Sequence, residues 1–552
     1  MKNLIRRSRM KLKRLLFMAV ALVLIVGMLP TAFAQDTKAV TLSYPQELDT
    51  LNPMYTVMWF VGITGEIYLE GAWVFDDELN PVPRIAAEIP SAENGGVSED
   101  GKTITIKVRE GATWSDGDPI TSADFVFTYE MIMAPGNAPA TRYPYAEFVT
   151  SVEAPDESTV VVNFNEPFAP WLATLFTYVL PEHVLRPVFE EEGTIDNAEW
   201  NRAPTVGSGP FVFDTWEVGS FMRFVRNENY YGDPAQLDVV VVTFVPDAES
   251  YVLGLELGEA DLGTFIAYSD VPRLEETGVL SIEVVASGYN EAWFLNVNPE
   301  TGHPALQDVN VRKALAMGFN RSQITEDLLL GLTYPAASFW ENTPYASPNV
   351  EAIPYDPEGA AALLDEAGWV DSNGNGTRDK DGVELSLRYI TNTRQIRQDT
   401  QVVAQQQLAD IGIELVLENY PSDIYFNGYA DGGPAATGQY DIAQWSATTS
   451  FPDPDTSRFR CDQIPSDENP TGANWTGYCN PELDALFDQQ AVTTDPAARI
   501  AIYNQIDEMF AADVIWVGVW HDPDLWVYNQ RVEGVRLNGA DPFWNISTWA
   551  VR

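Results

Sequence analysis

Residues 99–131 read EDGKTITIKVREGATWSDGDPITSADFVFTYEM, and each part of this segment has a local structural role. An Asp-Gly turn precedes TITIKV, which alternates β-branched and polar residues as a half-buried strand does. After a second turn at 116–119, Thr121 or Ser122 can cap the amino terminus of a helix. The segment therefore predicts a hairpin followed by a helix, an arrangement that any α+β domain could contain.

Six further blocks follow the same pattern of local signals, in order along the chain. They are DTLNP (49–53), GSGPFVFDTWEVGSFMRFVRNENYYG (207–232), DVNVRKALAMGFNRSQI (308–324), YDPEGAAALLDEAGW (355–369), QQLADIGIELVLENY (406–420) and NWTGYCNPELDALF (474–487). Together with 99–131, these blocks resemble the peptide/nickel-binding family of extracytoplasmic solute-binding proteins of ABC importers, family 5. The resemblance extends over residues 49–487 and leaves the ligand open.

The resemblance implies an α/β fold that is periplasmic-binding-protein type II-like, with two lobes joined by a hinge plus an inserted α+β domain. In this family the lobes close over a buried solute, and a membrane permease of the ABC importer recognises the closed form. No catalysis is implied. The expected boundaries are 36–75, 203–287 and 519–552 for the first lobe, 76–202 for the inserted domain and 288–518 for the second lobe.

The amino terminus has the pattern of a secretory signal peptide. Residues 1–14 carry seven Lys/Arg and no acid, 15–29 are apolar apart from Gly27, and Ala32-Phe33-Ala34 precedes Gln35. The apolar run is shorter than the ~20 residues that span a bilayer, which favours cleavage after residue 34 over an uncleaved anchor. No Cys lies near this point, so we expect a protein of the periplasm or external cell envelope that is not lipid-anchored.

The mature chain is strongly acidic. Of the 32 Lys/Arg, seven lie in the signal peptide, so 25 remain against 80 Asp/Glu, a formal charge of −55. Such a chain repels nucleic acid and anionic lipid, so we expect no nucleic-acid partner. With 45% apolar residues the composition is globular, and we expect a monomer of more than one lobe.

The two cysteines, Cys461 and Cys479, stand in a Pro/Asn/Gly-rich segment of an exported chain. An oxidising compartment favours a disulfide between them, and two unpaired thiols are the alternative.

The sequence lacks the signature motifs of several common enzyme classes. The three histidines, His183, His303 and His521, stand far apart, and the chain has no GxSxG, GxxxxGK[ST] or GxGxxG motif. An envelope glycoside or peptide hydrolase remains the alternative from another class, since eighty acids could always supply a carboxylate pair.

One segment follows the oxygen-ligand spacing of an EF-hand-like loop, with Gly382 where the bidentate Glu would stand. The alternatives are a structural calcium site and a plain Asn/Gly turn before the strand VELSLRYI. The candidate ligands are Asp371, Asn373, Asn375, Thr377 and Asp379.

The resemblance also suggests ligand-binding residues near the two hinge crossings and after DTLNP. Aromatic side chains in a closing cleft can pack on a sugar or on peptide side chains. Arg394 lies near where peptide-binding relatives place an arginine for the ligand carboxylate. The other candidates in these segments are Tyr55, Trp59, Trp293, Asn296 and Trp520.

The segment 440–455, YDIAQWSATTSFPDPD, departs from peptide-binding relatives, which carry an aspartate shortly after the tryptophan to pair with the ligand ammonium. Here Trp445 is followed by Ser, Ala, Thr448 and another Thr, and the first acid is Asp453. A buried ammonium without a carboxylate is costly, so we expect Asp453 to supply the charge if the ligand is a short peptide. A neutral oligosaccharide is the alternative ligand.

Overall fold

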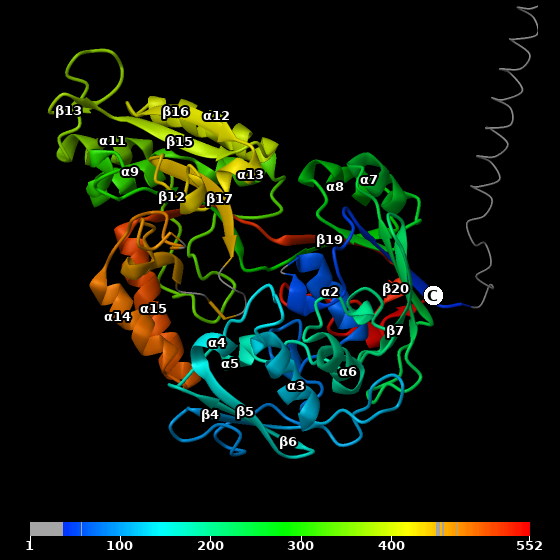
Figure 1. Ribbon diagram of the computed structural model, residues 1–552. Coiled ribbons are helices and arrows are strands. Elements are labelled where there is room, and N and C mark those ends of the chain that lie inside the picture. Colours follow the sequence, from blue (N-terminus) through cyan, green and yellow to red (C-terminus); the bar gives the residue numbers. More distant parts are fainter. Residues whose placement is uncertain (1–36, 57, 449–452, 455–456, 471) are drawn as a thin grey trace, which may run out of the picture.

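The computed structural model describes residues 37–552 apart from 57, 449–452, 455–456 and 471. Within this part of the chain, two large sheets form separate bodies, and a smaller three-stranded sheet lies at the far end of the first (Figure 1). The predicted signal peptide lies outside the described residues. No helix among the described residues is long and apolar enough to cross a bilayer.

The first lobe is built on a seven-stranded sheet. Strand β1 pairs in parallel with β9 and β10, and β19 runs antiparallel between β10 and β11. In the order of pairing, the strands are β11 (Leu280–Val285), β19 (Asp524–Asn529), β10 (Leu262–Thr264), β1 (Ala39–Tyr44), β9 (Val239–Phe244), β8 (Phe221–Arg226) and β7 (Phe211–Glu217). Its helices and short strands are α2 (Trp59–Tyr68), α7 (Ala248–Glu256), α8 (Val271–Glu275), β2 (Trp73–Phe75), β3 (Pro81–Pro83), β20 (Val532–Glu533) and β21 (Ala550–Val551).

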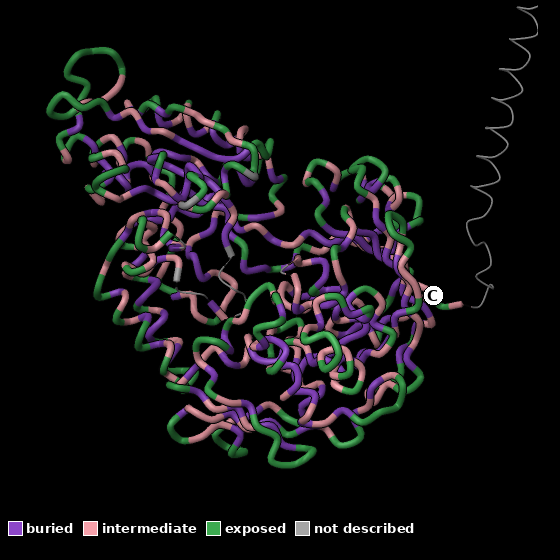
Figure 2. The backbone as a smooth tube through the Cα atoms, viewed as in Figure 1, coloured by how far each residue is buried: buried purple, intermediate pink, exposed green. Residues whose placement is uncertain are grey.

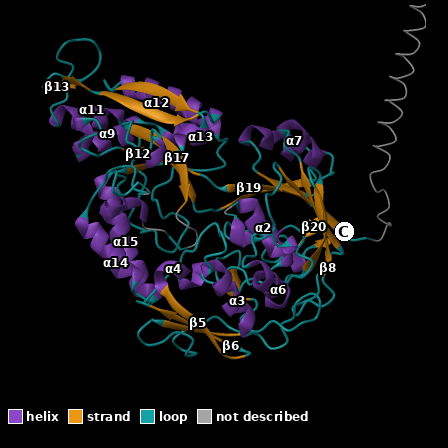
Figure 3. Cartoon of the chain, viewed as in Figure 1, coloured by secondary structure: helices purple, strands orange, loops and turns teal. Residues whose placement is uncertain are grey.

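The inserted domain has an antiparallel three-stranded sheet covered by helices (Figure 3). Thr121 and Asp124 form a capping box at the start of its longest helix, which confirms the predicted N-cap. Its elements are β4 (Thr103–Lys107), α3 (Ser122–Met133), α4 (Tyr145–Phe148), β5 (Val149–Asp156), β6 (Thr159–Phe164), α5 (Trp171–Thr174) and α6 (Glu182–Glu192). Its buried side chains belong to the same apolar core as those of the first lobe, so the two parts pack as one body. Figure 2 shows where the buried segments lie along the backbone.

The second lobe is built on a five-stranded sheet with helices on both faces. In the order of pairing, the strands are β16 (Glu414–Tyr420), β15 (Ser386–Asn392), β17 (Ile442–Thr448), β12 (Tyr289–Leu295) and β18 (Trp516–His521). The helices are α9 (Val309–Gly318), α10 (Arg321–Gln323), α11 (Pro357–Glu366), α12 (Gln395–Ala409), α13 (Ser422–Tyr425), α14 (Pro481–Ala491) and α15 (Pro496–Asp513). The predicted strand 383–390 is split at Leu385 into the short hairpin strand β14 (Val383–Glu384), which pairs with β13 (Asp379–Lys380), and β15.

A buried ion pair ties three elements of the second lobe together. Arg397 of α12 donates two hydrogen bonds of 2.8 Å to the Glu291 carboxylate of β12. Gln444 of β17 donates a third, also of 2.8 Å, to the same carboxylate. Glu291 is fully buried and Arg397 is 5% exposed, so each charge depends on the other for compensation.

The chain crosses between the two sheets twice. Residues 286–288 connect β11 to β12, and Asp522-Pro523 connects β18 to β19. The crossings are hydrogen-bonded to each other: Ser287 Oγ donates to the Asp522 carbonyl (2.8 Å), and the Asp522 amide donates to the Tyr289 carbonyl (3.0 Å). The boundary expected between residues 518 and 519 falls inside β18, which continues in the second sheet to His521.

Cys461 and Cys479 form the predicted disulfide. The backbone amide of Cys461 donates to the carboxylate of Asp484, which holds this loop against α14.

Candidate functional site

A cavity of about 630 Å³ lies between the lobes, beside the two crossings. This volume is within the usual range for a small-ligand site. Both lobes contribute to its wall. The lining residues are Trp59, Thr264, Phe265, Ile266, Ala267, Tyr268, Asp524 and Leu525 from the first lobe, Tyr289, Arg394 and Ser446 from the second, and Asp522 and Pro523 from the crossing itself.

Two carboxyl groups, Asp522 of the return crossing and Asp524 at the start of β19, form the acidic part of this cavity. Asp522 accepts hydrogen bonds from the Ser446 hydroxyl (3.0 Å) and from the Trp520 indole (3.3 Å). Burial, and then the nearby charge of Asp522, raise the pKa of Asp524 to about 7. A carboxyl with this pKa is poised to ionise when a cation arrives.

Arg394 brings the opposite charge to the same cavity. It is the N-cap residue of α12, and its guanidinium Nη1 lies 3.8 Å from Asp522 Oδ2. Since 46% of the side chain is exposed, the arginine is free to reorient toward an anionic group of a ligand. The cavity thus offers both a cation and a pair of acids.

A second hollow of about 390 Å³ continues from the first along the second lobe, because Tyr289 and Ser446 line both. Its wall is rich in aromatic rings. Trp445 forms one side and is held in place by stacking on Phe294, with 3.8 Å between the ring centroids. The other aromatic lining residues are Phe426, Tyr429 and Trp475.

A third cavity, of about 360 Å³, lies beneath α2 between the first lobe and the inserted domain. It contains Glu66 and Asp541, and burial raises the pKa of both carboxyls, that of Asp541 to about 6. Its lining residues all lie outside the second lobe, so hinge closure would not complete this cavity.

Of the predicted ligand-binding residues, Trp59 and Arg394 line the cavity between the lobes, and Trp445 lines the adjoining hollow of the second lobe. The other predicted aromatics line neither. Tyr55 is only partly exposed and packs against the core of the first lobe. Trp520 is 1% exposed in the core of the second lobe, and it contributes to the cavity only through its hydrogen bond to Asp522.

Trp293 and Asn296 are structural residues. Trp293 is fully buried, stacks on Phe319 and donates a hydrogen bond of 2.7 Å to the Tyr389 hydroxyl. The amide of Asn296 donates to the carbonyls of Gly438 and Tyr440. Trp293 lies on β12, an interior strand of a sheet that is covered on both faces, and Asn296 directly follows this strand.

Asp453 was expected to pair with a ligand ammonium, but in the structure it pairs with an arginine of the protein. Arg499 of α15 donates hydrogen bonds of 2.5 and 2.7 Å to its two carboxylate oxygens. That carboxylate is already compensated, and Asp453 does not line either interlobe cavity. The backbone of Thr448 pairs with Tyr289 in the sheet, while its side chain lies outside the part that the structure describes.

Asp522 and Asp524 are the functional candidates that the sequence analysis missed. The sequence HDPDLW (521–526) could have indicated them, because it directly follows Trp520, a predicted ligand-binding residue, and places two acids at the expected return crossing. Tyr268 and Tyr289 were also missed, because their place in the cavity depends on how the lobes face each other.

The proposed calcium loop is closed by its own backbone. Asp371 accepts the amides of Gly374, Asn375 and Gly376, and Asp379 accepts the amide and hydroxyl of Ser372. Asn373 and Asn375 donate to Glu384, and the Thr377 amide donates to the Asn375 side chain. These bonds explain the turn without an ion, and calcium binding stays a prediction.

Comparison with known proteins supports a single family. The profile described as Bacterial extracellular solute-binding proteins, family 5 Middle, matches residues 80–462. The oligopeptide-binding protein AppA of Bacillus subtilis is 26% identical over 488 residues, covering 86% of this chain and 84% of that protein. A putative ABC transporter peptide-binding protein of Brucella ovis is 28% identical over 457 residues, covering 82% of this chain and 81% of that protein.

Comparison with solved structures leads to the same kind of protein. The solved structure of the ABC transporter substrate-binding protein CtaP from Listeria monocytogenes superposes with a TM-score of 0.77 at 24% identity, covering 94% of this chain and 100% of that one. This similarity confirms the predicted two-lobed fold class.

Proposed function

The chain belongs to family 5 of the bacterial extracellular solute-binding proteins, and we propose that it captures a short peptide between its lobes and delivers it to the permease of an ABC importer. Membership of this family makes it a binding protein and not an enzyme, and its site of action is outside the cytoplasm.

The observation that carries the proposal is the pairing of opposite charges in the 630 Å³ cavity. A peptide brings an ammonium at one end and a carboxylate at the other. Asp522 and Asp524 are suited to the ammonium, and Arg394 to a carboxylate. The aromatic hollow next to them would hold apolar side chains of the same peptide.

An oligosaccharide is the second candidate ligand, because the rings of Trp59, Trp445 and Trp475 could pack on sugar faces. The charged groups argue against it. A neutral sugar would supply no opposite charge, and it would leave Arg394 and Asp522 with only their 3.8 Å contact to each other once closure removed water from the cavity. A peptide would supply an ammonium for the acids and a carboxylate for the arginine.

The hinge would act at the two crossings, since residues 286–288 and 522–523 alone lead from one sheet to the other among the described elements. Ligand bound to both walls of the cavity stabilises the closed form by the difference in its affinity for the two forms. We further propose that the protein is a monomer, freed into the cell envelope by cleavage after residue 34 and without a lipid anchor.

The test combines calorimetry with small-angle X-ray scattering on the mature protein. Panels of short peptides and of neutral oligosaccharides are titrated, and scattering is recorded with and without each solute that binds. We expect micromolar or tighter binding of some peptides and a smaller radius of gyration in their complexes. Binding of sugars alone would overturn the peptide assignment, and an unchanged radius with bound peptide would overturn the closure mechanism.

A further inference from the structure

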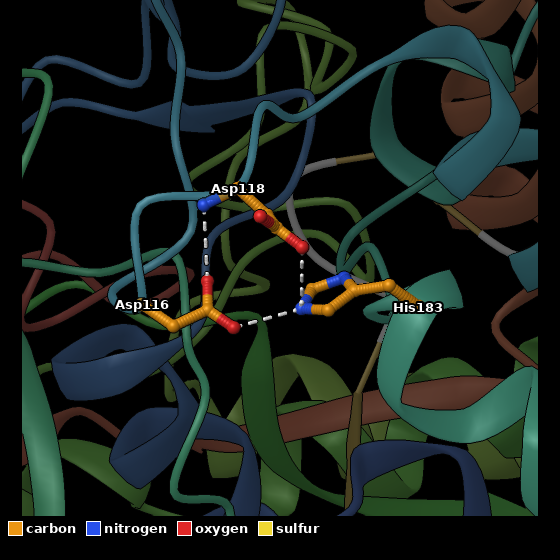
Figure 4. Close-up of side chains that lie close together, drawn as sticks. All are labelled: Asp116, Asp118 and His183. Atoms are coloured by element: carbon orange, nitrogen blue, oxygen red, sulfur yellow. Dashed lines mark hydrogen bonds and ion pairs between the residues drawn. The ribbon is translucent and has the colours of Figure 1, made fainter.

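A histidine and two aspartates of the inserted domain lie close together (Figure 4). None of them lines the interlobe cavity. His183 Nε2 lies 3.0 Å from Asp116 Oδ2 and 3.9 Å from Asp118 Oδ2. One potential ligand atom from each of the three side chains lies within 4.8 Å of the other two. The histidine stands in the first turn of α6, and the aspartates flank the glycine of the WSDGDP turn.

The backbone beneath this cluster is fixed by a buried carboxylate. Asp124 accepts the amide of Thr121, which follows the WSDGDP turn, at 2.9 Å. Its other oxygen accepts the amide of Glu182, the residue before the histidine, at 3.0 Å. Asp124 is 3% exposed, so it holds together the two segments that carry the cluster.

The side chains are also oriented toward a common point. Asp116 Oδ1 accepts the backbone amide of Asp118 at 3.2 Å, which turns Oδ2 toward the imidazole. The His183 ring packs against the buried Trp114, with 6.0 Å between the ring centroids. The carboxylate of Asp118 is 63% exposed and needs only a small rotation to shorten its 3.9 Å separation from Nε2.

From this geometry we propose that Asp116, Asp118 and His183 bind a divalent first-row transition ion such as Zn²⁺. Ligand atoms bound at about 2.0–2.2 Å from one ion lie roughly 3–3.5 Å apart. The 3.0 Å between His183 and Asp116 already fits this range, and the 3.9 Å between His183 and Asp118 would shorten on binding. One imidazole and two carboxylates match the donor set of such ions, and the mixed set favours them over Ca²⁺ or Mg²⁺. Water would complete the coordination, because all three side chains are partly exposed.

The position of the cluster indicates the effect of the ion. It would join the WSDGDP turn to α6 with bonds that add to the clamp made by Asp124. It would not take part in ligand capture, since none of the three residues lines the cavity between the lobes.

The experiment uses the mature protein without a histidine tag, titrated with Zn²⁺ by calorimetry and with Cu²⁺ by electron paramagnetic resonance. We expect one ion per chain, with nitrogen coupling from a single imidazole in the Cu²⁺ spectrum. His183→Gln should remove that coupling and weaken Zn²⁺ binding by about 100-fold or more, because loss of even an outer-shell partner costs 10–100-fold. Asp118→Asn, at an exposed side chain, should weaken it without affecting the fold.

His303→Gln and Asp371→Asn are the matched controls, the first at another histidine and the second in the proposed calcium loop. Both should bind Zn²⁺ as the parent does. Zn²⁺ affinity unchanged by His183→Gln, or no binding tighter than about 1 mM, would overturn the proposal. Neither result would bear on peptide binding, which is measured separately.

Discussion

Binding of a peptide ammonium to Asp524 should release a proton. In the free protein, burial and the neighbouring Asp522 raise the pKa of Asp524 to about 7, so at pH 6 its carboxyl is about 90% protonated. An ammonium in contact stabilises the ionised form and lowers the pKa by roughly 1–3 units. The carboxyl must then lose its proton as the peptide enters.

The size of the release follows from the two pKa values. For a fall of about two units, the carboxyl in the complex is only about 10% protonated at pH 6, so close to 0.8 proton leaves per peptide bound. The peptide ammonium keeps its proton at this pH and adds little to the exchange. Peptide affinity should accordingly rise as the pH increases from 6 toward 7.

Calorimetry measures this exchange directly. The observed binding enthalpy is plotted against the ionisation enthalpy of several buffers at pH 6, and the slope gives the number of protons exchanged. Asp524→Asn should bring the slope near zero and weaken binding by about 2 kcal/mol or more, roughly 30-fold.

The matched control is Asp507→Asn on α15. Burial raises the pKa of Asp507 to about 6, but this carboxyl is bonded to Ser338 and Ser347 and does not line the interlobe cavities. Its variant should keep the slope of the parent. Tight peptide binding by the parent with a slope near zero would refute the role given to Asp524.

Three further predictions concern stability. Glu291→Gln should lower the free energy of unfolding by about 3–5 kcal/mol, because it leaves the buried Arg397 guanidinium without its counter-charge; a loss below about 1 kcal/mol in urea would contradict this. Cys461→Ser removes the disulfide to Cys479 and should lower the free energy of unfolding in urea by about 3 kcal/mol. A variant as stable as the non-reduced parent would contradict this stabilising role of the disulfide. Burial lowers the pKa of His521 to about 4, so the unfolded chain gains a proton on this residue that the folded chain does not as the pH falls from about 6.5 to 4. The stability of the parent relative to that of His521→Asn should therefore drop by about 3 kcal/mol across that window, and a difference between the two that does not change with pH would exclude this effect of the histidine.

Local signals in the sequence predicted the elements well. The capping box at Thr121 and Asp124, and the helix that starts at Pro357 and ends before Gly368, depend on neighbouring residues only. The disulfide could be predicted for a similar reason, because two cysteines in an exported chain allow one pairing.

The site was harder to predict because it depends on contacts between distant residues. Trp293 was expected at the surface of the cleft, but it is buried because β12 is an interior strand of a sheet covered on both faces. Asp453 was expected to be available to a ligand, but Arg499, which follows it by 46 residues, compensates its charge. No local sequence pattern predicts a pair of residues so far apart in the chain.

The place of β19 in the first sheet constrains the order in which this protein can fold. Strand β19 is the element that connects β11 to β10, and it is made of residues 524–529, near the end of synthesis. The second lobe is built from the continuous stretch 289–521, so it can complete its sheet first. Until β19 pairs with them, the edge of β10 is open to other strands, and β11 has no partner in the sheet. The ligand cavity is therefore complete only once β19 has joined the sheet, since Asp524 and Leu525 belong to this strand and line the cavity.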